Sequence, residues 1–310
     1  MYKSLNNLLK HKKSNISLAI KKSLSIKKFS DNPKVDPFGG QYLKDPVPNP
    51  HRLKDKYAII TGGSNGIGKS TCELFEKSGV SGLIIADIDA KNGKELAEKL
   101  NEDRKSKFAF FAETDMLKSS SIEKMVTSCM QRFGKLNIMF NNAGIMHYDD
   151  GDPTQTEEDV WDLTMNVNLK GVYLCTKYGI PYMLNSGGGS IINVASFVAV
   201  MGAATPQVAY TASKGGVLAF SRELAIIYAK KGIRVNALCP GPIRTPLLMD
   251  FLSDEEKRAR RIVHIPMGRF GEAREIAQAC AFLASDESSL ITGTTFMVDG
   301  GVSSAYVTPL

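Results

Sequence analysis

From Lys56 onward the chain alternates short apolar runs with longer amphipathic stretches, and this alternation limits the possible folds more than any other feature. A short apolar run bounded by turn residues predicts a buried strand, whereas apolar residues recurring every third or fourth position predict a helix. Strands are predicted at residues 57–61, 82–86, 108–112, 137–141, 190–194, 234–238 and 295–298. Helices are predicted at residues 66–79, 90–104, 119–133, 156–185, 210–231 and 272–284.

This order of elements predicts an α/β fold with one doubly wound parallel sheet of about seven strands, flanked by helices on both faces. Strands joined through helices pair in parallel by right-handed crossovers. Open sheets of this kind bind their ligands at the carboxyl ends of the strands. Functional residues are therefore expected directly after each strand.

The first fifty residues differ in composition from the rest and are predicted to be a basic extension, followed by a domain at 51–310. Residues 1–30 contain eight lysines and no acidic residue. An acid-free, serine-rich, amphipathic segment resembles a mitochondrial targeting peptide, although the first arginine is Arg52. A disordered basic tail and a membrane-surface segment remain alternatives. Residues 31–50 hold five prolines and two glycines and are predicted to be a linker. We expect a mitochondrial location, with the cytoplasm as the alternative.

Composition argues against several classes of function. The net charge is +7, but the residues after position 30 carry 31 basic and 32 acidic side chains, so a basic groove for nucleic acid is not expected. Five scattered cysteines without a CxxC pair indicate reduced thiols. No apolar stretch approaches the roughly 20 residues of a membrane span. The four histidines do not cluster, so no metal site is expected.

A glycine-rich turn, TGGSNGIG at residues 61–68, follows the first predicted strand and opens the first helix. Glycines in this context let a pyrophosphate approach the amino terminus of the helix. Asp87 ends the next strand, 19 residues beyond Gly68. Its carboxylate is placed to accept hydrogen bonds from an adenosine ribose and to repel the 2′-phosphate of NADP. Asp115, after the third strand, is a candidate contact to adenine.

The same turn also fits a second phosphate-binding pattern. Residues 63–70 match GxxxxGK[ST], in which Lys69 and Ser70 would contact the phosphates and Mg²⁺ of a nucleoside triphosphate. Up to this point in the chain the two interpretations are nearly tied.

Tyr210 and Lys214 lie four positions apart, on one face of a predicted helix. A nearby ammonium group favours the phenolate, so Lys214 is expected to lower the pKa of Tyr210. Tyr210 then becomes a candidate acid/base for the interconversion of an alcohol and a ketone. Ser196 follows the strand at 190–194, where its hydroxyl would bond the reacting oxygen; a turn or helix cap is the alternative role.

Taken together, these segments resemble the short-chain dehydrogenase/reductase family over residues 55–301. The segments that carry the resemblance are TGGSNGIG at 61–68, Asp87, NNAG at 141–144, NVNLKG at 166–171, Ser196, YTASK at 210–214, PGPIRT at 240–245 and DGG at 299–301. A triphosphate loop explains none of the later segments.

The resemblance implies a Rossmann fold and assigns roles to residues that spacing alone left open. Asn168, Ser196, Tyr210 and Lys214 would be catalytic, with Asn168 holding a water in a proton relay. Ile243 and Thr245 would contact the nicotinamide carboxamide. The cofactor-binding residues implied are Gly62, Ser64, Asn65, Gly66, Ile67, Gly68, Asp87, Asp115, Met116, Asn142, Ala143, Gly144, Tyr210, Lys214, Pro240, Gly241, Ile243 and Thr245.

We therefore expect an oxidoreductase that transfers a hydride between NAD(H) and a secondary alcohol or ketone. The alternatives are an NADPH-dependent reductase of 3-oxoacyl thioesters and a catalytically idle dinucleotide-binding subunit. Asn65 stands in the glycine turn where a basic side chain would favour NADPH. The resemblance also implies a homodimer or homotetramer that associates through the helices containing residues 168–185 and 210–231.

Two segments are expected to border the substrate. The spacing between Ser196 and Tyr210 is slightly longer than is usual in the family, which enlarges the loop at 201–208. Residues 246–261 follow the nicotinamide-contacting segment and are predicted to form a mobile flap over the substrate, with packing against a neighbouring subunit as the alternative.

Overall fold

The computed structural model describes residues 47–306 apart from positions 204 and 253. The predicted targeting segment within residues 1–46 lies outside the described residues.

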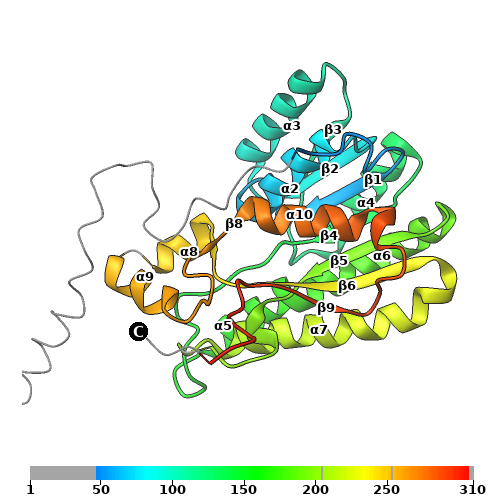
Figure 1. The fold of residues 1–310 in the computed structure, drawn as a ribbon. Coiled ribbons are helices and arrows are strands. Elements are labelled where there is room, and N and C mark those ends of the chain that lie inside the picture. The colour runs from blue at the N-terminus through cyan, green and yellow to red at the C-terminus, as the bar shows by residue number, and fades with distance from the viewer. Residues whose placement is uncertain (1–46, 204, 253, 307–310) are drawn as a thin grey trace, which may run out of the picture. The chain divides into compact units, whose positions relative to one another are not determined.

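Seven parallel strands form the central sheet (Figure 1). They are β1 (Tyr57–Thr61), β2 (Gly82–Asp87), β3 (Ala109–Glu113), β4 (Ile138–Asn141), β5 (Gly189–Val194), β6 (Ile233–Pro240) and β9 (Thr295–Val298). Their order in the sheet is β3-β2-β1-β4-β5-β6-β9, and every neighbouring pair is parallel. The predicted doubly wound α/β fold is confirmed. The direction of winding reverses between β1 and β4, which is where an open sheet forms its ligand crevice.

Helices cover both faces of this sheet. One face packs against α2 (Gly66–Lys77), α3 (Ala90–Arg104) and α10 (Ala273–Ala284). The other face packs against α4 (Ser119–Phe133), α6 (Gly171–Asn185) and α7 (Val208–Tyr228). Figure 1 shows α10 and α7 on opposite sides of the strands.

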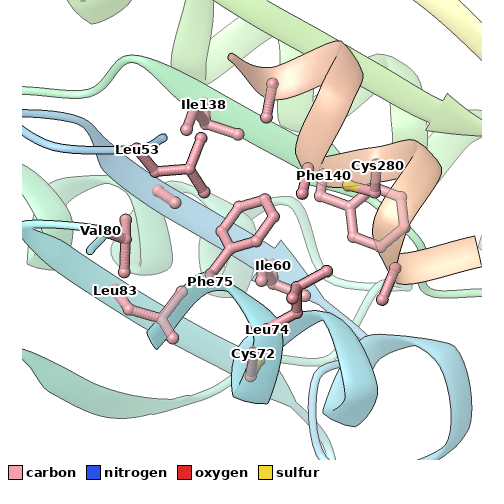
Figure 2. Close-up of a cluster of buried hydrophobic side chains, with 14 of the residues drawn as sticks. Leu53, Ile60, Cys72, Leu74, Phe75, Val80, Leu83, Ile138, Phe140 and Cys280 are labelled. Atoms are coloured by element: carbon pink, nitrogen blue, oxygen red, sulfur yellow. The ribbon is translucent and has the colours of Figure 1, made fainter. Parts of the chain in front are cut away.

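Successive strand residues point into different cores because side chains alternate across a sheet. Ile60 packs with Phe75 and Cys280 on the α2 and α10 side, as Figure 2 shows. The next residue back, Ile59, packs with Met125 on the α4 side. Burial on both faces explains why the strands read as continuous apolar runs instead of alternating ones.

The long helix predicted at 156–185 is interrupted in the structure. It comprises α5 (Glu158–Met165), a π-helical turn (Asn166–Lys170) and α6. The amide of Gly171 donates to the carbonyl of Asn166, the wider spacing that defines a π-turn. Such turns often lie at functional sites, and this one contains the fully buried Asn168.

A small appendage follows β6. Strand β7 (Ile243–Arg244) pairs with β8 (Gly271–Glu272), and between them lie α8 (Pro246–Phe251) and α9 (Glu255–Ile262). The side chain of Thr245 caps α8, and that of Asp254 caps α9. The predicted flap is therefore a pair of short helices. None of the helices that the structure describes is both long enough and apolar enough to cross a membrane.

Candidate active site

The glycine turn after β1 lies at the sheet edge where the winding reverses, the usual place of a ligand crevice. Gly62 has φ +62°, a conformation that favours glycine, and a Cβ on Gly68 would collide with the carbonyl of Gly62. The side-chain amide of Asn142 fixes the turn to β4 by donating to Thr61 O at 3.0 Å and to Gly62 O at 3.1 Å. The turn thereby brings the end of β4 against the start of α2.

The amino terminus of α2 fits an anion. Its N-cap residue, Asn65, makes no side-chain capping bond, and the first turn of the helix contains no acidic residue. A helix start leaves four backbone N–H groups without partners inside the helix, and a pyrophosphate is a suitable acceptor for them. These residues can therefore hold the phosphates of a dinucleotide.

Asp87 lies at the end of β2, where the sequence placed it. Its Oδ2 accepts the amide of Ser64 at 2.9 Å and its Oδ1 accepts the amide of Asp89 at 3.1 Å. The carboxylate thus joins the glycine turn to the β2–α3 connection. This places it beside the pocket expected for the adenosine ribose.

Two neighbours of Asp87 were not predicted from the sequence. Asp89 caps α3 by accepting the amide of Asn92 at 3.1 Å, and this bond lowers the pKa of Asp89 below its ordinary value. Its other oxygen lies 3.4 Å from Nδ2 of Asn65 in the glycine turn. Ile88 is 69% exposed, which is unusual for a large apolar residue at the end of a buried strand, and offers a surface for a planar ring. The signal in the sequence was the pattern Asp-Ile-Asp at a strand end.

Lys214 is buried beneath the crevice. Its ammonium donates to the carbonyl of Val194 at 2.9 Å and lies 5.6 Å from the ring centre of Tyr210. Burial lowers the pKa of Lys214 to about 8. The buried amine is held by a strand end two residues before Ser196.

Tyr210 is half-buried in the first turn of α7. Burial raises its pKa above the ordinary value, and a hydrogen bond with the Ser196 side chain opposes that rise. The expectation that Lys214 lowers this pKa is therefore wrong for the ligand-free protein. Loss of hydration sets the direction of the shift, and the ammonium of Lys214 donates to the Val194 carbonyl. The phenol consequently keeps its proton at neutral pH, as a general acid must.

Ser196 caps a short turn and also contacts Tyr210. Its side chain is almost fully buried and contacts Tyr210. Its hydroxyl oxygen also accepts the amide of Val198 at 3.4 Å, which caps a short 3₁₀ turn, η3 (Phe197–Ala199). The turn fixes the direction of the hydroxyl.

Asn168 ties three segments together from the π-helical turn. Its Oδ1 accepts the amide of Ile145 at 2.8 Å, and its Nδ2 donates to Ile145 O at 2.9 Å and to Ser213 Oγ at 3.1 Å. Ser213 directly precedes Lys214 in α7. A Cβ on Gly144 would lie 3.2 Å from both Asn168 Oδ1 and Lys214 Nζ, so the two side chains flank this glycine. The four predicted catalytic residues are thus brought together.

The role of Asp150 was not predicted from local sequence. This carboxylate is buried, and it accepts the amides of Ala209 at 3.0 Å and of Tyr210 at 2.8 Å. It therefore caps α7 from a segment 59 residues upstream of Ala209. Gln207, the N-cap residue, supplies no side-chain bond.

The remaining predicted cofactor residues differ in what their side chains do. Asp115 accepts the amide of Leu117 at 3.0 Å and pairs with Lys118 at 3.1 Å, and the first of these bonds lowers its pKa. The partly buried side chain of Met116 packs against the core beside α4 and α6.

The PGPIRT segment runs from the end of β6 over the glycine turn. Thr245 lies next to Gly66, since a Cβ there would be 3.5 Å from the threonine methyl. Ile243 is buried, and Gly241 donates its amide to Val298 O at 3.0 Å. Among the described residues, no group of three or more His, Cys, Asp or Glu side chains could hold a metal ion.

Comparison with known proteins adds relatives over most of the chain. Residues 62–303 match the family described as enoyl-(acyl carrier protein) reductase. A 3-oxoacyl-[acyl-carrier-protein] reductase of Thermotoga maritima is 38% identical over 81% of this chain and 99% of its own length. A cyclohexanol dehydrogenase of an Acinetobacter species is 35% identical over 82% of this chain and 97% of its own length. The crystal structure of levodione reductase superposes with a TM-score of 0.76 at 32% identity, covering 82% of this chain and all of that one.

Proposed function

The chain belongs to the short-chain dehydrogenase/reductase family of nicotinamide-dependent oxidoreductases, and from this premise we propose that it transfers a hydride between NAD(H) and a secondary alcohol or its ketone. One observation carries the proposal. The side chain of Tyr210 bonds to Ser196, and its ring lies 5.6 Å from the buried amine of Lys214, on the same sheet edge as the glycine-rich turn that opens α2.

Each residue has a distinct part in the proposed reaction. The nicotinamide, when bound, supplies or accepts the hydride. In reduction, Ser196 orients the substrate carbonyl through a hydrogen bond, and Tyr210 donates its phenolic proton to the oxygen as negative charge develops there. In oxidation Tyr210 accepts the proton of the alcohol. Lys214, whose ammonium lies over the ring of Tyr210, stabilises the phenolate left behind. Asn168 holds the backbone at Ile145 and the helix turn at Ser213 in register.

The preference for NAD is supported by charge. Asp87 and Asp89 place two carboxylates around the turn that would receive the adenosine ribose, and Asn65 adds no positive charge. A 2′-phosphate entering this space would lose its hydration without gaining a cation, which disfavours NADP.

The competing candidate is an NADPH-dependent reductase of 3-oxoacyl thioesters. It is favoured by the 38% identity to a protein named as such a reductase. The two acids at the ribose position argue against it, while the cyclohexanol dehydrogenase relative favours an alcohol or ketone.

Titration of the purified full-length protein with NADH and NADPH, followed by cofactor fluorescence, tests the proposal. A screen of secondary alcohols and ketones then measures turnover. Tight binding of NADH with turnover of an alcohol or ketone supports it. Preference for NADPH together with turnover of a 3-oxoacyl thioester selects the competing candidate. Cofactor binding without any turnover selects the idle subunit, and binding of neither cofactor removes both enzyme candidates.

A homo-oligomer is part of the proposal. An open apolar groove of about 460 Å³ lies between the π-helical turn, α6 and α7. It is lined by Met165, Asn166, Leu169, Lys170, Tyr173, Gly216 and Phe220. Tyr173 is 45% exposed beside it and contacts the edge of the Phe220 ring. A second copy of the chain is the proposed occupant, since exposed apolar surface of this kind marks association sites.

Mitochondrial targeting by the N-terminal segment is also proposed, on the lysine-rich, acid-free composition of residues 1–30. A fluorescent fusion carrying residues 1–50 tests it. Import into mitochondria is the expected result, and a diffuse cytosolic signal would contradict it.

A further inference from the structure

The flap, defined as α8 and α9, is attached on both sides to segments that border the catalytic residues. On one side Phe251 stacks on Tyr148, with ring centres 4.3 Å apart and an interplanar angle of 18°. On the other side Arg261 donates from Nη2 to the hydroxyl of Thr205 at 2.6 Å. Tyr148 follows β4 and NNAG, whereas Thr205 lies between Ser196 and Tyr210. The flap therefore bridges the two walls of the substrate space.

An apolar cluster beneath the flap fixes its position. Leu252, Ile265, Phe270 and Val302 form its buried centre. Phe197, the residue after Ser196, packs against the same cluster. Ile262, the residue after Arg261, packs against this cluster as well, so the cluster joins the end of α9 to the residue that follows Ser196.

Arg261 is half-buried without a compensating acid. Among the residues that the structure describes, no carboxylate lies within 4.0 Å of its guanidinium, whereas Lys257 on the same helix pairs with Asp254 at 3.3 Å. Loss of hydration, and then the charge of Arg260, lower the pKa of Arg261. The guanidinium stays charged at neutral pH, because its pKa begins above 12. A positive charge that is partly desolvated and unpaired is a favourable position for an anion.

We propose that the substrate of this enzyme carries an oxyanion, either a carboxylate or a phosphate, which Arg261 binds at the end remote from the reacting carbon. This inference rests on the proposed hydride transfer and names the substrate class of that same site. A guanidinium has five N–H donors, and the bond to Thr205 occupies one of them. The others can form the bidentate pair that carboxylate and phosphate groups accept.

The test compares charged ketones with matched neutral ones on the full-length protein. Oxo-carboxylates of increasing length, starting with 4-oxopentanoate, are measured against their methyl esters, and hydroxyacetone phosphate is measured against hydroxyacetone. The expected result is a kcat/KM at least about 10-fold higher for one anionic series than for its neutral partners. The arm with the larger ratio identifies the carboxylate or the phosphate.

Variants assign the preference to Arg261. Arg261→Gln is expected to lower the anion-to-neutral ratio by about 10- to 100-fold, and Arg261→Lys by less, since it keeps the charge and loses the planar fork. Arg260→Gln is the matched control on the exposed neighbouring position, where the ratio should stay as in the wild type. Equal use of charged and neutral ketones by the wild type would overturn the inference. An unchanged ratio in Arg261→Gln would overturn it as well.

A binding measurement separates this inference from the proposed function. In the presence of NADH, the best anionic ketone is expected to raise the thermal midpoint of the wild type, while its neutral partner and the Arg261→Gln protein show a smaller shift. Such a shift without turnover would refute the proposed reaction and support the anion site. Turnover of ketones without a larger thermal shift for the anionic ketone would support the proposed reaction and refute the anion site.

Discussion

Asp150 holds the backbone of Tyr210, because its Oδ2 accepts the tyrosine amide at 2.8 Å while its Oδ1 accepts the preceding amide, of Ala209, at 3.0 Å. The acid that caps the helix thus also fixes the residue expected to transfer the proton. Buried carboxylates are costly unless their oxygens are bonded, and here both are.

Asp150 is therefore predicted to position Tyr210. Asp150→Ala should lower the free energy of unfolding by about 1–2 kcal/mol, as loss of an N-cap does, and should lower kcat more than it raises the KM for ketone. Asp150→Asn keeps one acceptor oxygen and should recover much of both. Asp150→Asn also removes a negative charge beside Tyr210, which should lower the pKa of the phenol. The fall of kcat/KM in alkaline solution should therefore begin at a lower pH than in the wild type. Urea denaturation and pH–rate profiles measure these effects. Equal kcat in all three proteins would exclude a positioning role.

Tyr210→Phe should lower kcat by about 10²- to 10⁴-fold, the usual contribution of a general acid, with NADH binding largely retained. Tyr228→Phe, farther along the same helix, is the matched control and should stay active. In the wild type the raised pKa of Tyr210 keeps the phenol protonated through neutral pH. The kcat for ketone reduction should accordingly be constant through neutral pH and decline only in alkaline solution. A Tyr210→Phe protein that kept more than about a tenth of the wild-type activity would contradict the assignment of Tyr210 as the general acid.

Asp87→Asn and Asp89→Asn test the basis of cofactor choice. Asparagine keeps one acceptor oxygen, which retains the bond of residue 89 to the Asn92 amide and one of the two backbone bonds of residue 87, so the turn should persist without its negative charge. Each change should raise the NADPH-to-NADH ratio of kcat/KM by about 10-fold, and the double variant by more, since unit charges a few ångströms apart interact by about 1 kcal/mol or more. Asp103→Asn, on the exposed side of α3, is the control. A wild-type preference for NADPH would show that the role given to Asp87 is wrong.

Lys214 should make the stability of the protein depend on alkaline pH. Its folded-state pKa of about 8 lies below the unfolded value, so the unfolded chain binds more protons between about pH 8 and 10.5. Stability attributable to this group therefore rises with pH across that window. Lys214→Met removes the buried charge but also the hydrogen bond to Val194. At pH 7 the free energy of unfolding of this variant should exceed that of the wild type by about 1–2 kcal/mol. At pH 10.5, where the wild-type amine is neutral, this difference should disappear.

The measurement is urea denaturation of both proteins at pH 7 and pH 10.5, with Lys124→Met on the exposed face of α4 as control. A Lys214→Met protein that is less stable than the wild type at both values would show that the burial of this amine carries no net cost.

The apolar groove over α6 and α7 predicts self-association. Tyr173→Glu replaces the exposed ring that borders the groove with a charged side chain. Light scattering should then show a lower oligomer mass than for the wild type, because burying an unpaired charge in an interface is costly. Tyr306→Glu, at the exposed end of the described chain, is the control. A wild-type protein that is monomeric at micromolar concentration would contradict the proposed oligomer.

Some of these features follow from local sequence. The bounds of the seven strands were predicted to within two residues, because hydrophobic periodicity acts between near neighbours. Helical spacing likewise predicted that Tyr210 and Lys214 share a face of α7. The same holds for Asp87 at the end of β2 and for the glycine-rich turn that opens α2. The start of α7 at Val208 was missed, since its cap is supplied by Asp150 and not by an adjacent residue.

The sequence by itself therefore determined the type and order of the elements and the identity of the four residues expected to catalyse. Only the tertiary structure decided the π-helical turn at Asn168, the raised pKa of Tyr210 and the lack of a carboxylate beside Arg261 among the described residues. These depend on contacts between segments far apart in the chain and on how much water those contacts exclude. Hydration and long-range packing set pKa values and charge pairing, and neither is encoded in the pattern of nearby residues.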